Sequence, residues 1–371
     1  MRRLFAIIMM SLLTGAASFA QWRPQPTPND TLQTVRVLPD GSTVFSIYAP
    51  KAREVSLAGD VVPWGVRLEP EYSPNGVWSI TVPGVKAGRY RYHFIVDGVH
   101  VQDPKSFEAT QMSAVATVEP DGRGFFSFRD DVPHGAMAVR SYYSRTLGES
   151  RTMRVWTPAG YEKGRAKLPV LYLIHGGGDT DTSWPGVGAA GDILDNLLAE
   201  GRIAPMIVVM PNGTIHTSDM MGEVPLFARD MTLDIIPFIE NNYRVLTDKD
   251  SRAIAGLSMG GMETLEVALG NIDLFSYVWV LSSSFAPGRD PVEEAVRLGV
   301  PANADRINRS FRQFVFTQGG KTDIAWQNGL NTRSELERLG VRFEYMEVEG
   351  GHSWYAWRQN LYDLAQRIFK K

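Results

Sequence analysis

Beyond about residue 141, hydrophobic positions gather into short continuous runs that alternate with helical segments. The runs predicted as strands are 153–156, 170–174, 206–210, 252–255, 277–281, 314–316 and 343–347, and the segments predicted as helices are 193–200, 232–242, 262–269 and 361–369. Runs such as 170–174 and 206–210 are apolar at every position, which is typical of strands buried on both faces. The pattern therefore predicts a mostly parallel sheet with helices on both faces.

The preceding stretch, residues 39–130, has a different pattern. Its β-branched and aromatic runs lie at 44–48, 54–58, 77–82 and 90–96. Turn sequences rich in Gly separate these runs, and no helical period lies between them. Several short strands at regular spacing predict a β-sandwich of about 100 residues. We place the domain boundary around Pro133 and Gly135 and assign residues 140–371 to the second domain.

Residues 1–20 have the pattern of a signal peptide: two arginines, an apolar stretch over 4–17, and small residues before a cleavage site after Ala20. The apolar stretch is short for a membrane span, and no second long apolar run follows. We therefore expect an exported, soluble protein without a membrane span, periplasmic or secreted. Residues 21–38 are Pro-rich and polar, and we expect a linker there.

Composition narrows the function classes. The net charge is −3 over 371 residues, which gives no electrostatic case for nucleic acid as a partner. The chain has no cysteine, so disulfides, a cysteine nucleophile and thiolate metal sites are excluded. Its six histidines are scattered, and no carboxylates have ligand spacing, so we expect neither a metal nor a cofactor.

The strongest chemical signal is the run 256–261, Gly-Leu-Ser-Met-Gly-Gly, between a predicted strand and a predicted helix. In that context G-x-S-x-G is the nucleophile turn of an α/β-hydrolase, and Ser258 is the predicted nucleophile. The Met259 amide, at the start of the helix, is one predicted oxyanion donor. The run 175–178, His-Gly-Gly-Gly, follows an earlier strand and matches the loop that supplies the second donor, which we assign to the Gly177 amide.

A serine nucleophile needs a base, and the candidates are His93, His100, His134, His175, His216 and His352. Only His352 follows the last predicted strand, as the chain order of this fold requires. The acid should follow a strand between the nucleophile and the base. Asp323, after the strand 314–316, is the preferred acid, and Asp290 is the alternative. This Ser-His-Asp set predicts ester hydrolysis through an acyl-enzyme.

With these residues placed, the chain resembles the feruloyl and acetyl xylan esterases of carbohydrate esterase family 1, the esterase-D-like family. The matching pieces lie at 175–178, Trp184, 210–213, 236–240, 256–261, 319–323, 350–354 and 357–358. Residues 39–130 resemble a family 48 carbohydrate-binding module, an early-set immunoglobulin-like domain, through 48–50, 55–60, Trp64, 76–78, 88–92 and 97–98. The resemblance implies an α/β-hydrolase domain preceded by an immunoglobulin-like sandwich, acting on feruloylated or acetylated xylan or its oligosaccharides.

Several points stay open at this level. No motif separates feruloyl from acetyl as the acyl group. The loop residues Trp184, Trp326, Trp354 and Trp357 are candidate substrate-binding residues that stack on a ferulate ring, or they pack the loops. The sandwich either binds sugar through Trp64 and Trp78 or covers the substrate cleft. The alternative functions are a siderophore esterase of the enterochelin type and a non-catalytic carbohydrate-binding protein.

Overall fold

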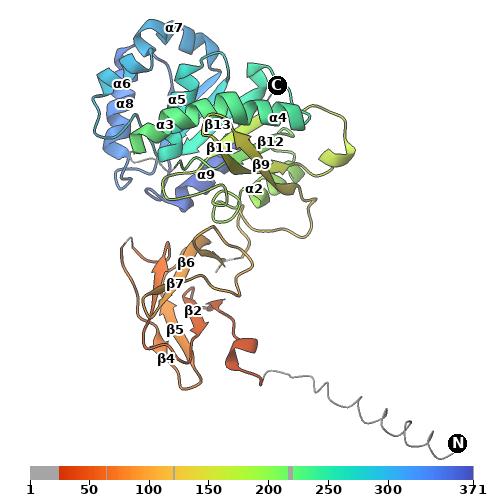
Figure 1. The fold of residues 1–371 in the computed structure, drawn as a ribbon, viewed down its shortest axis with the longest axis vertical. Helices are drawn as coiled ribbons and strands as arrows, with labels where there is room; N and C mark the ends of the chain where they lie inside the picture. Colours follow the sequence, from red (N-terminus) through yellow and green to blue (C-terminus); the bar gives the residue numbers. More distant parts are fainter. Residues whose placement is uncertain (1–24, 64, 120–121, 216–219, 371) are drawn as a thin grey trace, which may run out of the picture.

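The computed structural model describes residues 25–63, 65–119, 122–215 and 220–370 (Figure 1). The expected signal peptide, residues 1–20, lies outside the described residues, and so do Trp64 and His216. No helix in the described ranges is long and apolar enough to cross a bilayer.

The N-terminal domain is a sandwich of two antiparallel sheets. One sheet has the order β1 (Val35–Val37), β2 (Thr43–Tyr48), β5 (Val77–Val82), β4 (Glu71–Tyr72). The other joins β3 (Val55–Gly59), β6 (Gly88–Val96) and β7 (Val99–Val101), and β8 (Ala114–Val118) also pairs with β6. Phe45, Leu57 and Phe94 are fully buried between the two sheets.

The sandwich begins earlier than the sequence pattern indicates. Within residues 21–38, predicted as a linker, the structure has a short 3-10 helix (Pro28–Asp30) and β1, which pairs with β2 in the register Val35↔Phe45. A strand of three residues is too short to produce a recognisable alternation, so only its pairing partner identifies it. The linker prediction is therefore wrong for Val35–Val37.

The second domain is built on an eight-stranded sheet. Its strands are β9 (Ala136–Ser144), β10 (Glu149–Thr157), β11 (Val170–Ile174), β12 (Ile207–Pro211), β13 (Arg252–Leu257), β14 (Tyr277–Leu281), β15 (Gln313–Gln318) and β16 (Glu344–Glu347). The order is β16-β15-β14-β13-β11-β12-β10-β9. The strands from β12 to β16 run parallel, and the β9–β10 hairpin adds an antiparallel edge.

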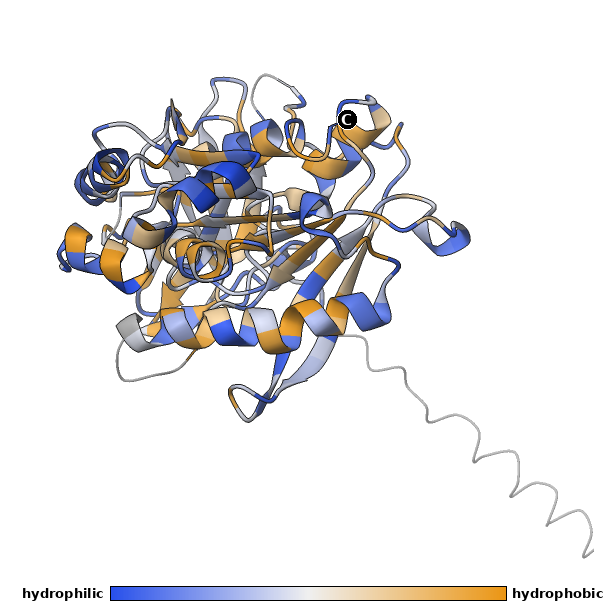
Figure 2. Cartoon of the chain, turned by 90° about the horizontal axis from the view of Figure 1, so that it is seen from above, coloured by the Kyte–Doolittle hydropathy of each residue, from blue (hydrophilic) through white to orange (hydrophobic). Residues whose placement is uncertain are grey.

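Helices cover both faces of this sheet, which confirms the predicted fold class. They are α2 (Ala190–Ala199), α3 (Met220–Asp230), α4 (Ile236–Asn242), α5 (Met259–Gly270), α6 (Pro291–Arg297), α7 (Val300–Ser310), α8 (Trp326–Arg338) and α9 (Trp354–Ala365), with a π-helical turn (Met231–Ile235) before α4 and 3-10 turns at Tyr161–Lys163 and Lys249–Ser251. Hydrophobic residues alternate with polar ones along the helices around the sheet (Figure 2). Within β11, Tyr172 faces the core on the α3–α5 side, and Leu171 and Leu173 face the core with α2 and α9.

The sandwich docks against the side of the sheet that α2 and α9 cover (Figure 1). Arg358 of α9 is 1% exposed, and its Nη1 donates to the Arg89 carbonyl of β6 at 3.0 Å and to the Val187 carbonyl at 2.9 Å. Arg89 in turn forms an ion pair with Asp192 of α2 at 2.5 Å. Because a buried guanidinium must keep its hydrogen-bond partners, these contacts make the two domains one packed unit.

Helix α5 carries a buried carboxyl at Glu263. The side chain is fully enclosed, and neither carboxyl oxygen has a hydrogen-bond partner within the part of the chain that the structure describes. Burial raises the pKa of Glu263 well above its ordinary value, Glu223 adds to the rise, and Arg151 opposes it. The folded protein therefore holds this side chain as a neutral acid well above the pH at which an exposed glutamate ionises.

Glu263→Gln should make stability less sensitive to rising pH. In wild type, the unfolded chain loses the Glu263 proton above its ordinary pKa of 4.5, whereas the folded chain keeps it, so stability falls as pH rises through this window. The amide has no such proton. The free energy of unfolding of the variant relative to wild type should grow by more than about 1 kcal/mol between about pH 4 and about pH 8. Chemical denaturation at each pH measures it, and a constant difference would contradict the buried neutral acid.

Candidate active site

The order of the strands brings two loops together at the carboxyl end of the sheet. Strand β11 lies between β12 and β13, and Ile174 is in register with Gly256. The loop after β11 and the turn after β13 therefore start side by side. Crevices beyond the carboxyl ends of parallel strands are where such sheets place their ligands.

The turn after β13 holds Ser258 in a strained conformation. Its φ is 52° and its ψ is −119°, a region that non-glycine residues rarely adopt. The neighbouring glycines make the turn possible: a Cβ on Gly256 would lie 2.0 Å from the Gly260 carbonyl oxygen, and one on Gly260 would lie 2.2 Å from the His175 carbonyl oxygen. The sequence pattern 256–260 thus satisfies a steric requirement, and it sets Ser258 at the N-terminus of α5.

Ser258, His352 and Asp323 form a continuous hydrogen-bond chain. The Ser258 Oγ lies 2.9 Å from His352 Nε2, and His352 Nδ1 lies 2.8 Å from Asp323 Oδ1. The Asp323 side chain is fully buried and that of His352 is 15% exposed. With a proton on Nδ1, the imidazole donates to the carboxylate and accepts from the serine hydroxyl, the arrangement that a general base needs.

Asp323 is held as a carboxylate. Burial opposes its ionisation, but hydrogen bonds from His352 and from the backbone amides of Gly319 and Ala325 outweigh burial and lower its pKa to about 2. The alternative acid, Asp290, lies elsewhere: its side chain caps α6 by accepting from the Val292 amide at 2.7 Å.

The loop at residues 175–179, called here the glycine loop, packs directly on the serine turn. A Cβ on Gly176 would lie 3.1 Å from the Ser258 Cβ, and one on Gly177 would lie 3.9 Å from the Met259 Cβ. Met259 is the first residue of α5, so its amide is among the helix N–H groups that have no acceptor within the helix. The two predicted oxyanion donors, at Gly177 and Met259, are therefore neighbours.

His175 supports the glycine loop from behind. It is 1% exposed, its Nδ1 lies 2.9 Å from the Gly176 carbonyl, and its Nε2 accepts from the Gly213 amide at 2.9 Å. Burial lowers its pKa, so it stays a neutral hydrogen-bonding residue. The remaining described candidates have other partners: His93 stacks on His100 in the sandwich, and His134 stacks on Phe128.

The four tryptophans predicted to bind substrate occupy three different environments. Trp184 is 1% exposed and donates its indole N–H to the Ile174 carbonyl, so it lies beyond the reach of a ligand. Trp354 and Trp357 are mostly buried but line the cleft, and Trp357 meets the His352 ring edge-on at 5.0 Å between centroids. Trp326 begins α8 and packs on Tyr345. The edge-to-face contacts Trp184–Trp354 and Trp354–Trp357 continue to His352 and hold its ring in place.

A cleft of about 1150 Å³ opens over Ser258 and His352, and both domains line it. From the catalytic domain, Ile324 and Tyr355 border it with 81% and 38% of their surface exposed. From the sandwich, the lining includes Asp60, Val66, Arg67, Tyr90, Arg91, His93 and Met112. No pattern in the sequence marks these sandwich residues, because the face that a sandwich turns toward another domain is set by tertiary packing.

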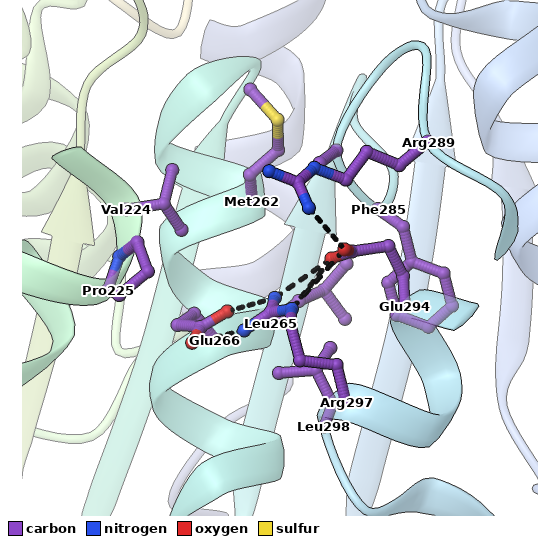
Figure 3. Close-up of a pocket in the computed structure, with 11 residues that line it drawn as sticks. Val224, Pro225, Met262, Leu265, Glu266, Phe285, Arg289, Glu294, Arg297 and Leu298 are labelled. Atoms are coloured by element: carbon purple, nitrogen blue, oxygen red, sulfur yellow. Dashed lines mark hydrogen bonds and ion pairs between the residues drawn. The ribbon is translucent and has the colours of Figure 1, made fainter. Parts of the chain in front are cut away.

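A second, smaller hollow of about 100 Å³ is lined by apolar residues and by four charged residues that pair with one another (Figure 3). Arg297 pairs with Glu266 at 2.6 Å and with Glu294 at 2.8 Å, and Arg289 lies 3.8 Å from Glu294. Ser258 does not line this hollow. We therefore assign the active site to the larger cleft.

A mostly parallel sheet with a strand–serine–helix turn, a Ser-His-Asp chain and a neighbouring glycine loop defines an α/β-hydrolase. The model of the family described as "Putative esterase" matches residues 144–368, and the chain belongs to this family. Residues 33–109 match "Carbohydrate-binding module 48 (Isoamylase N-terminal domain)".

The chain is similar to three known proteins in sequence or fold. It is 32% identical over 365 residues to "Endo-1,4-beta-xylanase/feruloyl esterase" of Xylanibacter ruminicola; the match covers 94% of this chain and 47% of the relative, so the chain spans about half of that protein. A solved "ferulic acid esterase" is 28% identical with a TM-score of 0.55 and covers 63% of this chain and 98% of its own. The enterobactin esterase of Shigella flexneri shares the fold over 88% of this chain and 94% of its own, at 20% identity and a TM-score of 0.63.

Proposed function

We propose that this protein is a serine esterase that hydrolyses hydroxycinnamoyl esters, feruloyl esters above all, on xylan or its oligosaccharides. The observation that carries the proposal is the Ser258–His352–Asp323 chain, whose hydrogen bonds measure 2.9 and 2.8 Å at the floor of the cleft. A non-catalytic carbohydrate-binding protein has no need of such a chain or of the strained Ser258 backbone.

The geometry supports a two-stage reaction. Ser258 Oγ attacks the ester carbonyl while His352 Nε2 takes its proton, and the oxyanion accepts from the Gly177 and Met259 amides. The carbon–oxygen bond to the sugar then breaks, and His352 returns the proton to the departing alcohol. Water, deprotonated by His352, attacks the acyl-enzyme and releases the free acid and Ser258. Asp323 stays a carboxylate throughout and stabilises the imidazolium.

The relatives and the cleft together favour an aromatic acyl group. The curated relative and the solved structure are both named for ferulate, and the chain is at least 28% identical to each. Ile324 and Tyr355 line the same cleft as Ser258 and add apolar surface to it, and the Trp357 ring meets His352 edge-on with Trp354 packed against it. The cleft volume of about 1150 Å³ is slightly above the usual range for small-molecule sites, so it has room for an acyl group together with part of a sugar.

The place of action is part of the proposal. Polymeric xylan is too large to enter a cell, so an enzyme that acts on the polymer has to be exported. The signal-peptide pattern of residues 1–20 agrees with export. N-terminal sequencing of the mature protein that begins at Gln21 would support cleavage after Ala20, and sequencing that begins at Met1 would refute it.

A second candidate is a siderophore esterase, because the enterobactin esterase shares the fold across both domains. A triscatecholate substrate favours cations around the site. Arg67 and Arg91 both line the cleft, but Arg91 is already neutralised by two aspartates, Asp60 and Asp179. The charge of the cleft thus gives this candidate less support than the aromatic lining gives the first.

One assay separates the candidates. Methyl ferulate, feruloylated xylo-oligosaccharides, acetylated xylan and a triscatecholate siderophore are compared side by side, with Ser258→Ala as the blank. We expect kcat/KM for the feruloyl substrates to exceed that for the siderophore by at least about 100-fold, a difference of roughly 3 kcal/mol in transition-state binding. Faster acetyl release would move the proposal to an acetyl xylan esterase, and faster siderophore hydrolysis would overturn it.

A further inference from the structure

Strand β6 of the sandwich contacts the catalytic domain at the glycine loop itself. The Arg91 Nη1 donates to the Asp179 Oδ1, and Asp179 is the last residue of that loop. We propose that Arg91 is a positioning residue for catalysis: through Asp179 it fixes the turn that carries the Gly177 amide. The proposal rests on the proposed function in taking Ser258 as the nucleophile and the glycine loop as its oxyanion site.

Asp179 closes the turn in which Gly177 lies. Its amide donates to the Gly176 carbonyl at 3.2 Å, which makes residues 176–179 a β-turn. Gly178, the third residue of the turn, has a φ of 76°, a value that type II turns require and that glycine adopts without strain. The direction of the Gly177 amide therefore depends on where the turn is anchored, and Asp179 is its anchor.

Two groups hold the Asp179 side chain: a hydroxyl from the catalytic domain and a guanidinium from the sandwich. The side chain is 6% exposed, and its Oδ1 accepts from the Ser183 hydroxyl at 3.0 Å as well as from Arg91. Its own carbonyl accepts from the Thr214 hydroxyl at 3.1 Å. Burial raises the pKa of Asp179, and Arg91 is the largest influence that opposes the rise. Without Arg91, this carboxylate is buried with no guanidinium beside it.

Asp60 fixes the orientation of the Arg91 guanidinium. Asp60 accepts from Arg91 Nε at 2.8 Å and from Nη2 at 3.0 Å, a two-point contact that sets the plane of the guanidinium. The preceding Gly59 has a φ of 130°, and a Cβ there would lie 2.2 Å from the Arg91 carbonyl oxygen, so glycine permits this close approach. The remaining Nη1 points to the glycine loop. Lysine has no planar fork and cannot make both contacts.

Other contacts hold the domains together away from the glycine loop. Arg89, two positions along β6, pairs with Asp192 of α2, and Arg358 donates to the Arg89 carbonyl. Loss of Arg91 therefore leaves the main docking contacts in place, and loss of Arg89 weakens docking without touching the turn. The two arginines form a matched pair: both are on one strand, and both bridge the domains.

The test uses the full chain with Arg91→Ala, Arg91→Lys, Asp179→Asn, the double variant Arg91→Ala/Asp179→Asn, and Arg89→Ala as the docking comparator. kcat and KM are measured on methyl ferulate and p-nitrophenyl acetate, and the melting temperature is measured for each variant. The rate at which a fluorophosphonate labels Ser258 gives a third readout, because the phosphonyl oxygen occupies the oxyanion site.

For Arg91→Ala we expect kcat to fall about 10- to 100-fold with KM within about three-fold of wild type, since the loss is one of donor geometry in the transition state. The kcat of Arg91→Lys should lie between those of Arg91→Ala and wild type. The double variant should recover several-fold in kcat over Arg91→Ala, because an amide at position 179 needs no cation. Arg89→Ala should lower the melting temperature at least as much as Arg91→Ala does, but it should lower kcat less.

Two results would overturn the Arg91 proposal. One is kcat and labelling within about two-fold of wild type in Arg91→Ala; the other is an equal loss of kcat in Arg91→Ala and Arg89→Ala. Failure of the proposed substrate is a separate outcome. A wild-type protein that hydrolyses neither ferulate nor acetate but whose Ser258 is labelled refutes the substrate class alone, and the labelling rates of the variants still decide the role of Arg91.

Discussion

Ser258→Ala should lower kcat on methyl ferulate by at least about 10⁴-fold while the melting temperature stays within a few degrees of wild type. The hydroxyl is the attacking atom, and nothing else at the floor of the cleft replaces it at 2.9 Å from His352 Nε2 in the part of the chain that the structure describes. The fold loses little, because alanine occupies the same positive φ of 52° at a cost similar to that of serine. Residual activity measures what the oxyanion site and binding achieve alone.

Ser283→Ala is the matched control for this loss. The Ser283 hydroxyl donates to the Ser258 carbonyl at 2.5 Å, so its removal deletes a neighbouring hydroxyl that has no part in bond making. We expect less than about a ten-fold loss of kcat together with a small loss of stability. If Ser258→Ala retained more than about a tenth of wild-type kcat, the serine mechanism would be refuted.

Asp323→Asn should lower kcat by about 10³- to 10⁴-fold with little change in KM. The carboxylate accepts from His352 Nδ1 at 2.8 Å and so keeps the other nitrogen, Nε2, free to take the serine proton. An amide that presents its N–H₂ to the ring favours the opposite tautomer. Since the pKa of Asp323 is lowered to about 2, its carboxylate is already formed throughout the pH range of the assay.

Asp290→Asn tests the alternative acid, because sequence order alone does not decide between Asp290 and Asp323. Asp290 caps α6 by accepting from the Val292 amide, away from His352, so the variant should keep kcat close to wild type. Its measurable effect is on stability, at most about 1 kcal/mol, because asparagine is also a good cap. A larger loss of kcat for Asp290→Asn than for Asp323→Asn would reverse the assignment of the acid.

The parts of the site that the sequence predicts are those specified by short local patterns. The turn around Ser258 and the glycine loop each need particular residues within six positions, because sharp turns and exposed amides leave few choices. His352 and Asp323 follow from the order of strands along the chain. The fold class follows in the same way from runs such as 170–174, which are buried on both faces.

The parts that the sequence does not predict depend on contacts between distant segments. Arg91 and Asp179 are 88 positions apart, and no local pattern pairs them. Trp184 has the position of a substrate-binding ring but is enclosed by tertiary packing, with its N–H bonded to the Ile174 carbonyl. The short strand β1 is defined by its partner β2 rather than by its own three residues.

The Arg358 guanidinium has a consequence for how such chains diversify. Its Nη1 donates to one carbonyl of the sandwich and to one carbonyl of the catalytic domain, and the side chain has almost no access to water. Recombination that exchanged the sandwich for another module would leave a buried cation without half of its acceptors, which costs several kcal/mol. In this chain, a replacement for the sandwich would therefore have to offer a carbonyl at the place of the Arg89 carbonyl.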